Sequence, residues 1–302
     1  MKKVIVIVGP TGVGKTKLSI ELAKQYDGEI ISGDSMQIYR HMDIGTAKVT
    51  KQEMEGITHH LIDIRNPDES YSVANFQQDC RRLIDDIYSR GKFPIIVGGT
   101  GLYIKAVLYD YHFEESNIDN EFYKKKYQDY SNESLYDLLL ETDPKSCQNI
   151  HPNNRQRVIR ALAIYESTGI KKSENIDQQD HCLLYDPYLV GLTLQREVLY
   201  QRINQRVDIM MDNGLLKEID YLMKQGYRPN CQSMKAIGYK EWFDYYNGKT
   251  DLKETIELIK QHSRNYAKRQ YTWFKNQMDI NWFDVNLEDF NQTVQQVIEK
   301  RK

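Results

Sequence analysis

A glycine-rich segment near the start of the chain has the residue types and spacing of a phosphate-binding loop. The sequence GPTGVGKT follows the apolar run Val4–Val8 and precedes an amphipathic stretch. Its glycines let the backbone curl so that successive N–H groups face one anion, and the following helix adds its dipole. Lys15 supplies a positive charge, and the Thr16 hydroxyl can hold Mg²⁺. The segment therefore predicts a site for a di- or triphosphate. Its expected lining is Gly9, Pro10, Thr11, Gly12, Val13, Gly14, Lys15 and Thr16.

A carboxylate and a glycine-rich turn follow two further predicted strands. Asp34 comes after the run Glu29–Ser32, and Thr100 lies in GGTGLY, after Pro94–Gly98. Parallel sheets bind ligands at the carboxyl ends of their strands, so both side chains are expected near the loop. From its position alone, Asp34 can be a general base, a Mg²⁺ ligand or the N-cap of the next helix. The segment around Thr100 can equally be only a tight turn into a helix.

Two pairs of helix residues are candidates for ligand contacts. Arg202 and Arg206 are one turn apart and could clamp a pyrophosphate, although an exposed helix explains them equally well. Gln156 and Arg160 share a face in the same way and could contact a base edge and a phosphate. They lie in a helix predicted over 151–169, which has a proline at an early position and a glycine just past its end.

The segment 260–275 contains five Lys or Arg residues and no carboxylate. Lys260, Arg264, Lys268 and Lys275 repeat along one helical face, and aromatic residues lie between them. In a chain of net charge −2, this basic stripe suits the phosphate backbone of a nucleic acid. A solvated helix face with core aromatics is the alternative interpretation.

The order of elements that must position these residues predicts an α/β fold. Apolar runs alternate with amphipathic stretches in the first half, as in a P-loop-type core whose parallel sheet is flanked by helices. Further strands are predicted at His60–Ile64 and Tyr188–Leu192, and after Leu192 the chain is expected to be nearly all helical. Between them, 112–186 shows only helical patterns. We therefore expect a core of 1–111 and 187–302, with its C-terminal helices, interrupted by a helical insertion domain.

The amino-acid composition indicates the general class of protein but does not indicate a ligand. The 302 residues are 40% hydrophobic and 28% charged, which fits a soluble globular protein of about two domains. No targeting or membrane-spanning segment is visible in the sequence. The four cysteines are widely scattered and form no Cys-x-x-Cys pair, which favours a cytoplasmic protein with reduced thiols and no structural metal.

The motifs together resemble those of the bacterial tRNA dimethylallyltransferases, the tRNA isopentenylpyrophosphate transferase family. The resemblance spans nearly the whole chain in the family's order. It rests on GPTGVGKT, DSMQIYRHMDIGTAK, GGTGLY, HPNNRQRVIRAL, KAIGYKE and RNYAKRQYTWF. The family transfers a five-carbon prenyl group from dimethylallyl diphosphate to N6 of the adenine next to the anticodon. The resemblance thus implies a transferase with tRNA as partner, a swivelling insertion domain and Mg²⁺ as cofactor. We expect a monomer.

The resemblance also implies roles for individual residues. Lys15, Thr16 with Mg²⁺, and one or both of Arg202 and Arg206 would neutralise the departing diphosphate, and Asp34 would be the general base. The adenine would be flipped into a channel between core and insertion. The implied tRNA contacts are Asp34, Ser35, Met36, Gln37, Thr100, Gln156, Arg157, Arg160, Lys235, Lys240, Arg264, Lys268 and Arg269.

Three other functions fit part of the pattern. A P-loop kinase of small molecules or nucleotides explains the glycine-rich loop and Asp34, but leaves the basic stripe unexplained. A nucleotide-gated RNA-binding protein without catalysis explains the stripe and gives Asp34 a metal-binding role. A prenyl transferase acting on free nucleotides does not need the long C-terminal segment.

Overall fold

The computed structural model of the chain describes residues 1–111, 118–177 and 182–301. It divides into two compact units. The first consists of Met1–Tyr109 and Leu183–Lys302, and the second, Asp110–Cys182, interrupts it. The swivelling role expected for 112–186 stays a prediction.

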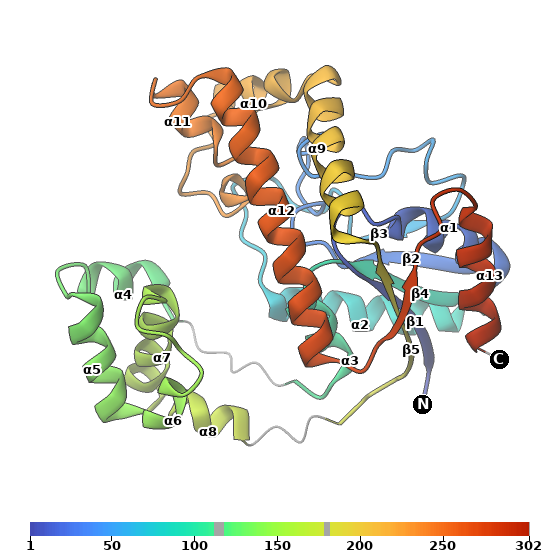
Figure 1. Cartoon of the computed structure of the whole chain (residues 1–302). Helices are drawn as coiled ribbons and strands as arrows, with labels where there is room; N and C mark the ends of the chain where they lie inside the picture. The colour runs from blue at the N-terminus through green and yellow to red at the C-terminus, as the bar shows by residue number, and fades with distance from the viewer. Residues whose placement is uncertain (112–117, 178–181, 302) are drawn as a thin grey trace. The chain divides into compact units, whose positions relative to one another are not determined.

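A six-stranded parallel sheet forms the centre of the first unit, with the strand order β3-β2-β4-β1-β5-β6 (Figure 1). Each pair of neighbouring strands runs parallel. The α/β class with a parallel sheet, predicted from the sequence, is confirmed. The strands are β1 (Lys3–Val8), β2 (Gly28–Ser32), β3 (His59–His60), β4 (Phe93–Gly98), β5 (Asp186–Thr193) and β6 (Asn281–Asp284).

Two strands differ from the prediction. The strand expected at His60–Ile64 is reduced to His59–His60, because Leu61 and Asp63 have positive φ angles of 59° and 56°, which extended pairing does not allow. Strand β6 lies in a region expected to be nearly all helical. It is a four-residue edge strand with a single buried residue, so it has no apolar run that a sequence pattern could show.

The sheet is covered on both faces. In β1, Val4, Val6 and Val8 belong to one apolar cluster, whereas Ile5 and Ile7 belong to another, because successive side chains of a strand point to opposite faces. Helices α2 (Val73–Ser89) and α3 (Gly101–Leu108) pack in the first cluster, and α1 (Lys15–Gln25) and α13 (Phe290–Arg301) pack in the second. This burial on both faces explains why the central strands are continuous apolar runs.

The rest of the first unit is helical and follows β5. It contains α9 (Arg196–Asp212), α10 (Leu215–Lys224), the short 3₁₀ helix η1 (Ser233–Lys235), α11 (Trp242–Tyr246) and α12 (Leu252–Gln277). Helix α12 is 26 residues long and starts at a capping box in which Asp251 and Glu254 satisfy each other's backbone N–H groups. It packs against α9, α11 and α3, so it returns to the ends of the sheet strands.

The second unit has an apolar core of its own, which includes Leu135, Leu139, Val158 and Leu162. Its helices are α4 (Asn120–Lys126), α5 (Asn132–Thr142), α6 (Pro144–Cys147), α7 (Arg155–Thr168) and α8 (Lys172–Asp177).

Helix α7 begins later than predicted. His151 to Asn154 form a turn, closed by a 2.8 Å hydrogen bond from the Asn154 N–H to the His151 carbonyl, so Pro152 precedes the helix. The predicted end is confirmed, because Gly169 caps the helix with a φ of 73°.

Candidate active site at the strand ends

The glycine-rich loop connects β1 to α1, as the sequence predicted. Gly9, Gly12 and Gly14 have φ angles of 142°, 82° and 108°, which side chains with a Cβ rarely adopt. Gly14 is the N-cap residue of α1, so the loop leads directly into the positive end of the helix dipole. This geometry suits an anion at the helix N-terminus.

Lys15 is folded back over the loop. Its Nζ donates to the carbonyl oxygens of Gly9 and Pro10, at 2.9 and 2.8 Å. Burial lowers the pKa of Lys15 to about 8, the positive charge of Arg206 acts in the same direction, and Asp34 opposes both. The amine, the guanidinium and the carboxylate therefore interact in one site.

Both arginines predicted as diphosphate contacts reach the loop from α9. The Arg202 Nε donates to the Gly12 carbonyl at 3.1 Å. Arg206 donates through Nη1 to the Thr11 hydroxyl at 3.2 Å and through Nη2 to the Ala47 carbonyl at 3.5 Å. Burial lowers the pKa of Arg206, and the nearby Asp34 opposes this shift. The two cations thus face the loop across about 190 residues of sequence.

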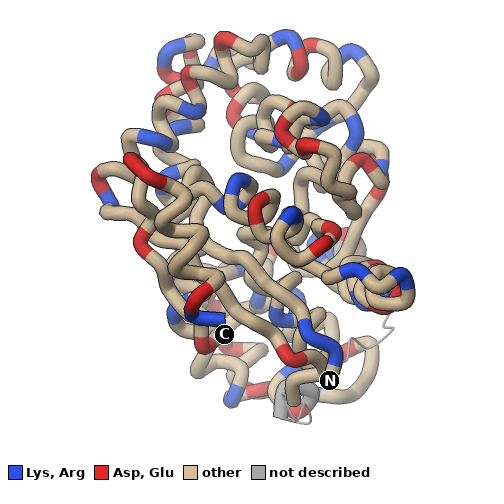
Figure 2. Tube along the Cα trace, turned by 90° about the vertical axis from the view of Figure 1, so that its right-hand side faces the viewer, with Lys and Arg blue, Asp and Glu red and all other residues tan. Residues whose placement is uncertain are grey.

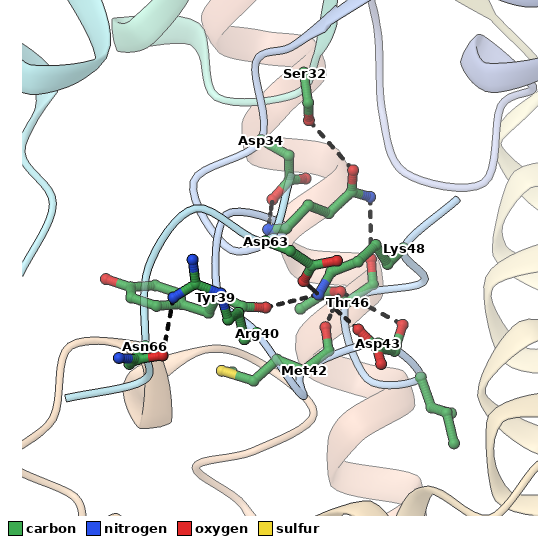
Figure 3. Close-up of polar contacts among 12 residues, drawn as sticks. Ser32, Asp34, Tyr39, Arg40, Met42, Asp43, Thr46, Lys48, Asp63 and Asn66 are labelled. Atoms are coloured by element: carbon green, nitrogen blue, oxygen red, sulfur yellow. Dashed lines mark hydrogen bonds and ion pairs between the residues drawn. The ribbon is translucent and has the colours of Figure 1, made fainter. Parts of the chain in front are cut away.

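Asp34 follows β2 and lies in a turn. Its Oδ1 accepts from the backbone N–H of Met36 at 2.8 Å and of Gln37 at 3.4 Å. Figure 3 shows Asp34 beside the polar contacts of the loop that follows it. No helix begins here, because the chain forms bends and turns up to β3, so the N-cap of a following helix is excluded as its role. Among the described residues, no hydrogen-bond partner of Oδ2 is found, which leaves this oxygen able to accept a proton.

Thr100, which lies between β4 and α3, connects to the Asp34 turn. Its Oγ1 accepts from the Ser35 N–H at 3.3 Å and donates to the Ser35 Oγ at 3.4 Å. The pKa of Tyr266 is raised to about 12, mainly by burial and also by the charge of Asp34, while the nearby Thr100 and Gln270 side chains oppose this shift. Tyr266 of α12 therefore lies at the same strand ends.

Gln270 is a site residue that the sequence patterns did not single out. Its Oε1 accepts from the Thr11 N–H and its Nε2 donates to the Gly99 carbonyl, both at 3.0 Å. The available signal was its spacing from the apolar residues Ala267 and Phe274, because all three are buried on one face of α12.

The loop after Asp34 is held by two clusters of polar contacts. The Nζ of Lys48 donates to the carbonyl of Tyr39 and to the carboxylates of Asp43 and Asp63, each at 2.6 Å (Figure 3). Glu218 of α10 accepts from the backbone N–H groups of Asp43, Ile44 and Gly45, and from the hydroxyl of Tyr239.

Tyr239 belongs to KAIGYKE, so this motif has a structural role. Lys235 and Lys240, which were predicted to contact tRNA, are exposed in the same segment.

The basic stripe is only partly available to a ligand. Lys260 forms ion pairs with Asp208 at 2.7 Å and Glu257 at 3.0 Å, so the expectation of a stripe without nearby carboxylates is wrong at this position. Asp208 comes from α9, which the pattern of α12 alone could not reveal. Arg264 donates to Asn204. Along the chain outside this stripe, Lys and Arg residues are interspersed with Asp and Glu residues (Figure 2).

Exposed cations remain in the C-terminal half of α12. Lys268 and Lys275 are exposed, and the Arg269 guanidinium lies 5.7 Å from the ring centre of Tyr266. Lys268 and Arg269 also line a shallow groove of about 560 Å³ together with Trp273. The groove combines positive charge with an aromatic side chain.

The candidates in the second unit are described within that unit. Gln156 and Arg157 are exposed in the first turn of α7, and Arg160 is half-buried one turn later. Arg155 instead stabilises the unit, since it donates to the carbonyls of Tyr127 and Tyr130.

Among the described residues there is neither a cluster of His, Cys, Asp or Glu side chains for a metal ion nor a helix that could cross a membrane. Thr16, the predicted Mg²⁺ ligand, is exposed at the second position of α1. Within 1–111, 118–177 and 182–301, no group of three or more His, Cys, Asp or Glu residues is arranged to hold a metal ion. None of the helices in these ranges is both long and apolar enough to cross a membrane.

Comparison with known proteins assigns the chain. A family model described as IPP transferase matches residues 37–277. The chain belongs to the IPP transferase family. The resemblance drawn from the motifs is thereby confirmed. A tRNA dimethylallyltransferase of Bacillus cereus is 57% identical over 287 residues, covering 94% of this chain and 90% of the relative. The protein of the same name from Bacillus anthracis is also 57% identical, with 94% and 91% covered.

Solved structures of the IPP transferase family have the same fold. The tRNA isopentenylpyrophosphate transferase of Bacillus halodurans is 46% identical, with a TM-score of 0.77 over 100% of this chain and 96% of the relative. A eukaryotic dimethylallyltransferase acting on tRNA is 35% identical, with a TM-score of 0.85 over 98% of this chain and 77% of the relative.

Proposed function

We propose that this member of the IPP transferase family transfers a dimethylallyl group from dimethylallyl diphosphate to N6 of the adenine on the 3′ side of the tRNA anticodon. The relatives named tRNA dimethylallyltransferase support the reaction, and the eukaryotic relative acting on tRNA supports the acceptor. The observation that carries the proposal is the electrostatic interaction of Asp34 with both Lys15 and Arg206. It brings a candidate base close to a site for an anionic leaving group. We call this site the diphosphate cradle: the glycine-rich loop with Lys15, Arg202 and Arg206.

The cradle suits the departure of diphosphate from an allylic carbon. When the bond between that carbon and the diphosphate oxygen breaks, its electron pair leaves with diphosphate, and negative charge grows there. Lys15, Arg202 and Arg206 lie against the loop and would stabilise this charge, together with the N–H groups at the start of α1. Fixed donors of this kind need no reorganisation during the reaction.

Asp34 suits the proton transfer that the acceptor needs. The N6 amine is a weak nucleophile because its lone pair is delocalised into the adenine ring. As the bond from N6 to the allylic carbon forms, N6 gives up a proton, and Oδ2 of Asp34, which has no hydrogen-bond partner among the described residues, would accept it. The hydrogen bonds from Met36 and Gln37 to Oδ1 hold the carboxylate in this orientation.

Mg²⁺ is the cofactor we propose, with Thr16 as its protein ligand. A hydroxyl is the hard oxygen donor that Mg²⁺ prefers, and the exposed Thr16 side chain lies beside the loop that would bind diphosphate. The ion would neutralise part of the leaving group's charge.

The groove on α12 has the side chains expected of a binding surface for a single-stranded tRNA loop. RNA-binding proteins combine cations for phosphates with aromatic side chains on which bases stack. Lys268, Arg269 and Trp273 provide both along one helix. The target adenine would leave its stack to reach Asp34, since enzymes that modify a base extrude it from the stack into the active site.

The test is incubation of the purified chain with dimethylallyl diphosphate, Mg²⁺ and unmodified tRNA, followed by mass analysis of the nucleosides. The expected product is adenosine carrying one dimethylallyl group at the position next to the anticodon. Parallel reactions contain ATP with small-molecule acceptors, or AMP in place of tRNA. Phosphoryl transfer from ATP would identify a kinase instead, and prenylated AMP without prenylated tRNA would identify an enzyme of free nucleotides.

A further inference from the structure

One buried amide joins two of the loops that form the site. Gln270 is 6% exposed and lies in the C-terminal half of α12. Its oxygen accepts from the N–H of Thr11 in the glycine-rich loop, and its nitrogen donates to the carbonyl of Gly99 after β4, both at 3.0 Å. Among the described residues, this side chain provides the hydrogen bonds that link the segment at Thr11 to the segment at Gly99.

The turn after β4 is shaped to admit this amide. A Cβ on Gly99 would lie 2.0 Å from the Nε2 of Gln270, a distance at which atoms overlap. A Cβ on Gly101 would lie 2.1 Å from the ring of Trp273, which comes one turn later in α12. A side chain at Gly99 would displace the Gln270 amide and one at Gly101 would displace the Trp273 ring, so these two glycines leave the room that the contacts of α12 use.

The amide is also part of a longer series of contacts that leads from the diphosphate cradle toward Asp34. Tyr266, one turn earlier in α12, lies close enough to Gln270 and Thr100 for both side chains to affect its pKa. Thr100 bonds with Ser35, which is next to Asp34, and the Thr11 hydroxyl accepts from Arg206. From the diphosphate cradle to the base, the series runs from Arg206 through Thr11 and Gln270 to Gly99, whose chain neighbour Thr100 bonds with Ser35.

We infer that Gln270 is a positioning residue for prenyl transfer, which sets the diphosphate cradle and the base Asp34 at the separation that the reaction needs. The inference rests on the proposed function. An amide is required because it presents one acceptor to Thr11 and one donor to Gly99 at the same time. A shift of about 1 Å between reacting groups can lower a rate about 100-fold, so the loss of this bridge acts on turnover.

The first test compares Gln270→Met with Gln261→Met. Methionine keeps the length of the side chain and loses both hydrogen bonds, and Gln261 is an exposed glutamine of the same helix. We expect kcat of Gln270→Met to fall about 10- to 100-fold, with tRNA affinity unchanged. Gln261→Met should match the parent in both. If kcat of a folded Gln270→Met stayed within about twofold of the parent, the inference would be overturned.

The second test separates positioning from general packing. In Gln270→Glu, the protonated carboxyl has the same acceptor and donor as the amide, whereas the carboxylate turns a second acceptor toward the Gly99 carbonyl. We therefore expect the ratio of its kcat to that of the parent to rise as pH falls. The ratio for Gln270→Met should stay constant. A flat ratio for Gln270→Glu would contradict the inference, and this test decides the matter if Gln270→Met fails to fold.

The parent, Gln270→Met and Gln270→Glu all contain the same other titratable groups near this part of the site. They are Tyr266 and Arg269 on α12, Asp34 after β2, Lys15 in the glycine-rich loop and Arg206 on α9. Their own titration changes variant and parent alike, so it largely cancels in the ratio.

Binding of inorganic pyrophosphate distinguishes failure of the inference from failure of the proposed function. We expect Gln270→Met to bind pyrophosphate about tenfold more weakly than the parent and Gln261→Met, since the Thr11 segment loses its support. If the parent transferred no prenyl group but this loss of affinity appeared, the proposed function would be wrong and the bridge would stand. Equal pyrophosphate affinity in all three proteins would overturn the inference.

Discussion

The two oxygens of Asp34 have different environments, and this difference defines its expected chemistry. Oδ1 is held by the N–H groups of Met36 and Gln37, while Oδ2 has no hydrogen-bond partner among the described residues. A carboxylate fixed through one oxygen can accept a proton through the other without losing its orientation. The same side chain interacts with Lys15 and Arg206, so it lies beside the expected position of the leaving group.

Replacing Asp34 with asparagine tests the base directly. We expect Asp34→Asn to bind tRNA like the parent and to lose prenyl transfer by roughly 100-fold or more, because an amide has the same size but cannot accept the proton. Single-turnover assays measure the chemical step, and Asp68→Asn, at an exposed aspartate, serves as the control. Near-normal single-turnover rates would exclude Asp34 as the base.

Lys15 gives diphosphate binding a specific pH dependence. Its pKa of about 8 is below the ordinary lysine value because the amine is buried near Arg206. Only the ammonium form attracts an anion, so above pH 8 binding must include proton uptake, and affinity falls by up to about tenfold per pH unit. Calorimetric titration with inorganic pyrophosphate measures this slope.

The matched variant is Lys15→Arg, since a guanidinium stays charged over this range. Titration of pyrophosphate itself is common to both proteins, so the parent should lose affinity more steeply above pH 8. Identical slopes would mean that the ammonium of Lys15 does not contact the anion.

Helix α12 contributes to the molecule along its whole length. Its N-terminal half is tied to the fold, since Lys260 pairs with Asp208 of α9. One face of its C-terminal half places Tyr266 and Gln270 at the strand ends. The opposite face of this half exposes Lys268 and other cations. A helix with these three roles explains a motif that is rich in both basic and aromatic residues.

The exposed cations of α12 should determine the salt dependence of tRNA binding. Each phosphate contact contributes about −0.7 to −0.9 to the slope of log affinity against log salt. We expect replacement of Lys268 and Lys275 by glutamine to reduce the magnitude of this slope by roughly 1 to 2 units. Filter binding at several salt concentrations provides the measurement.

Lys260→Gln is the control from the same helix. Because Lys260 pairs with Asp208 and Glu257, its loss should leave the slope close to that of the parent. An unchanged slope in the double variant would return these residues to a solvated helix face, and the phosphate contacts would then have to lie elsewhere.

Glu218 fixes the loop between Asp34 and β3. Its carboxylate accepts from three consecutive N–H groups and from Tyr239. Glu218→Gln turns an N–H₂ group toward these donors, so we expect the free energy of unfolding to fall by about 1 to 2 kcal/mol. Urea denaturation measures the change, with Glu299→Gln at an exposed position as the control. A loss no larger than in the control would show that the carboxylate does not stabilise this loop.

At the scale of the whole molecule, the chain folds as two units with separate apolar cores. The sheet clusters contain residues of the first unit, and the cluster around Leu135 and Leu139 contains residues of the second. Helix α7 and its neighbours bury this second core without a strand among the described residues of the unit. Each unit therefore has its own source of stability.

Leu139→Ala should destabilise the second unit selectively. Leu139 is fully buried, and truncation of such a leucine costs about 2 to 5 kcal/mol. The neighbouring Leu140 is 50% exposed, so Leu140→Ala is a control of identical chemistry. Hydrogen exchange should accelerate in peptides from 118–177 and stay unchanged in β1 and β4. Equal acceleration in the sheet strands would contradict separate cores.

The sequence by itself determined the elements and the local motifs. The apolar run before GPTGVGKT, the glycines within it and the helix after it depend on neighbours a few residues away, so β1, the loop and α1 were predictable. The same holds for Gly169 at the end of α7. Short or edge elements such as β6 were missed, because their stability comes from the adjacent strand and not from their own composition.

Only the tertiary structure decided which distant residues share the site. Arg206 and Gln270 meet Thr11 across 195 and 259 residues of sequence, and Lys260 meets Asp208 in the same way. The pattern of a helix reveals which face is buried, but not which loop that face contacts. The contacts of each face depend on how α9 and α12 pack over the strand ends. As a result of this packing, Lys260 of the basic stripe forms an ion pair with Asp208, and Gln270 connects two loops.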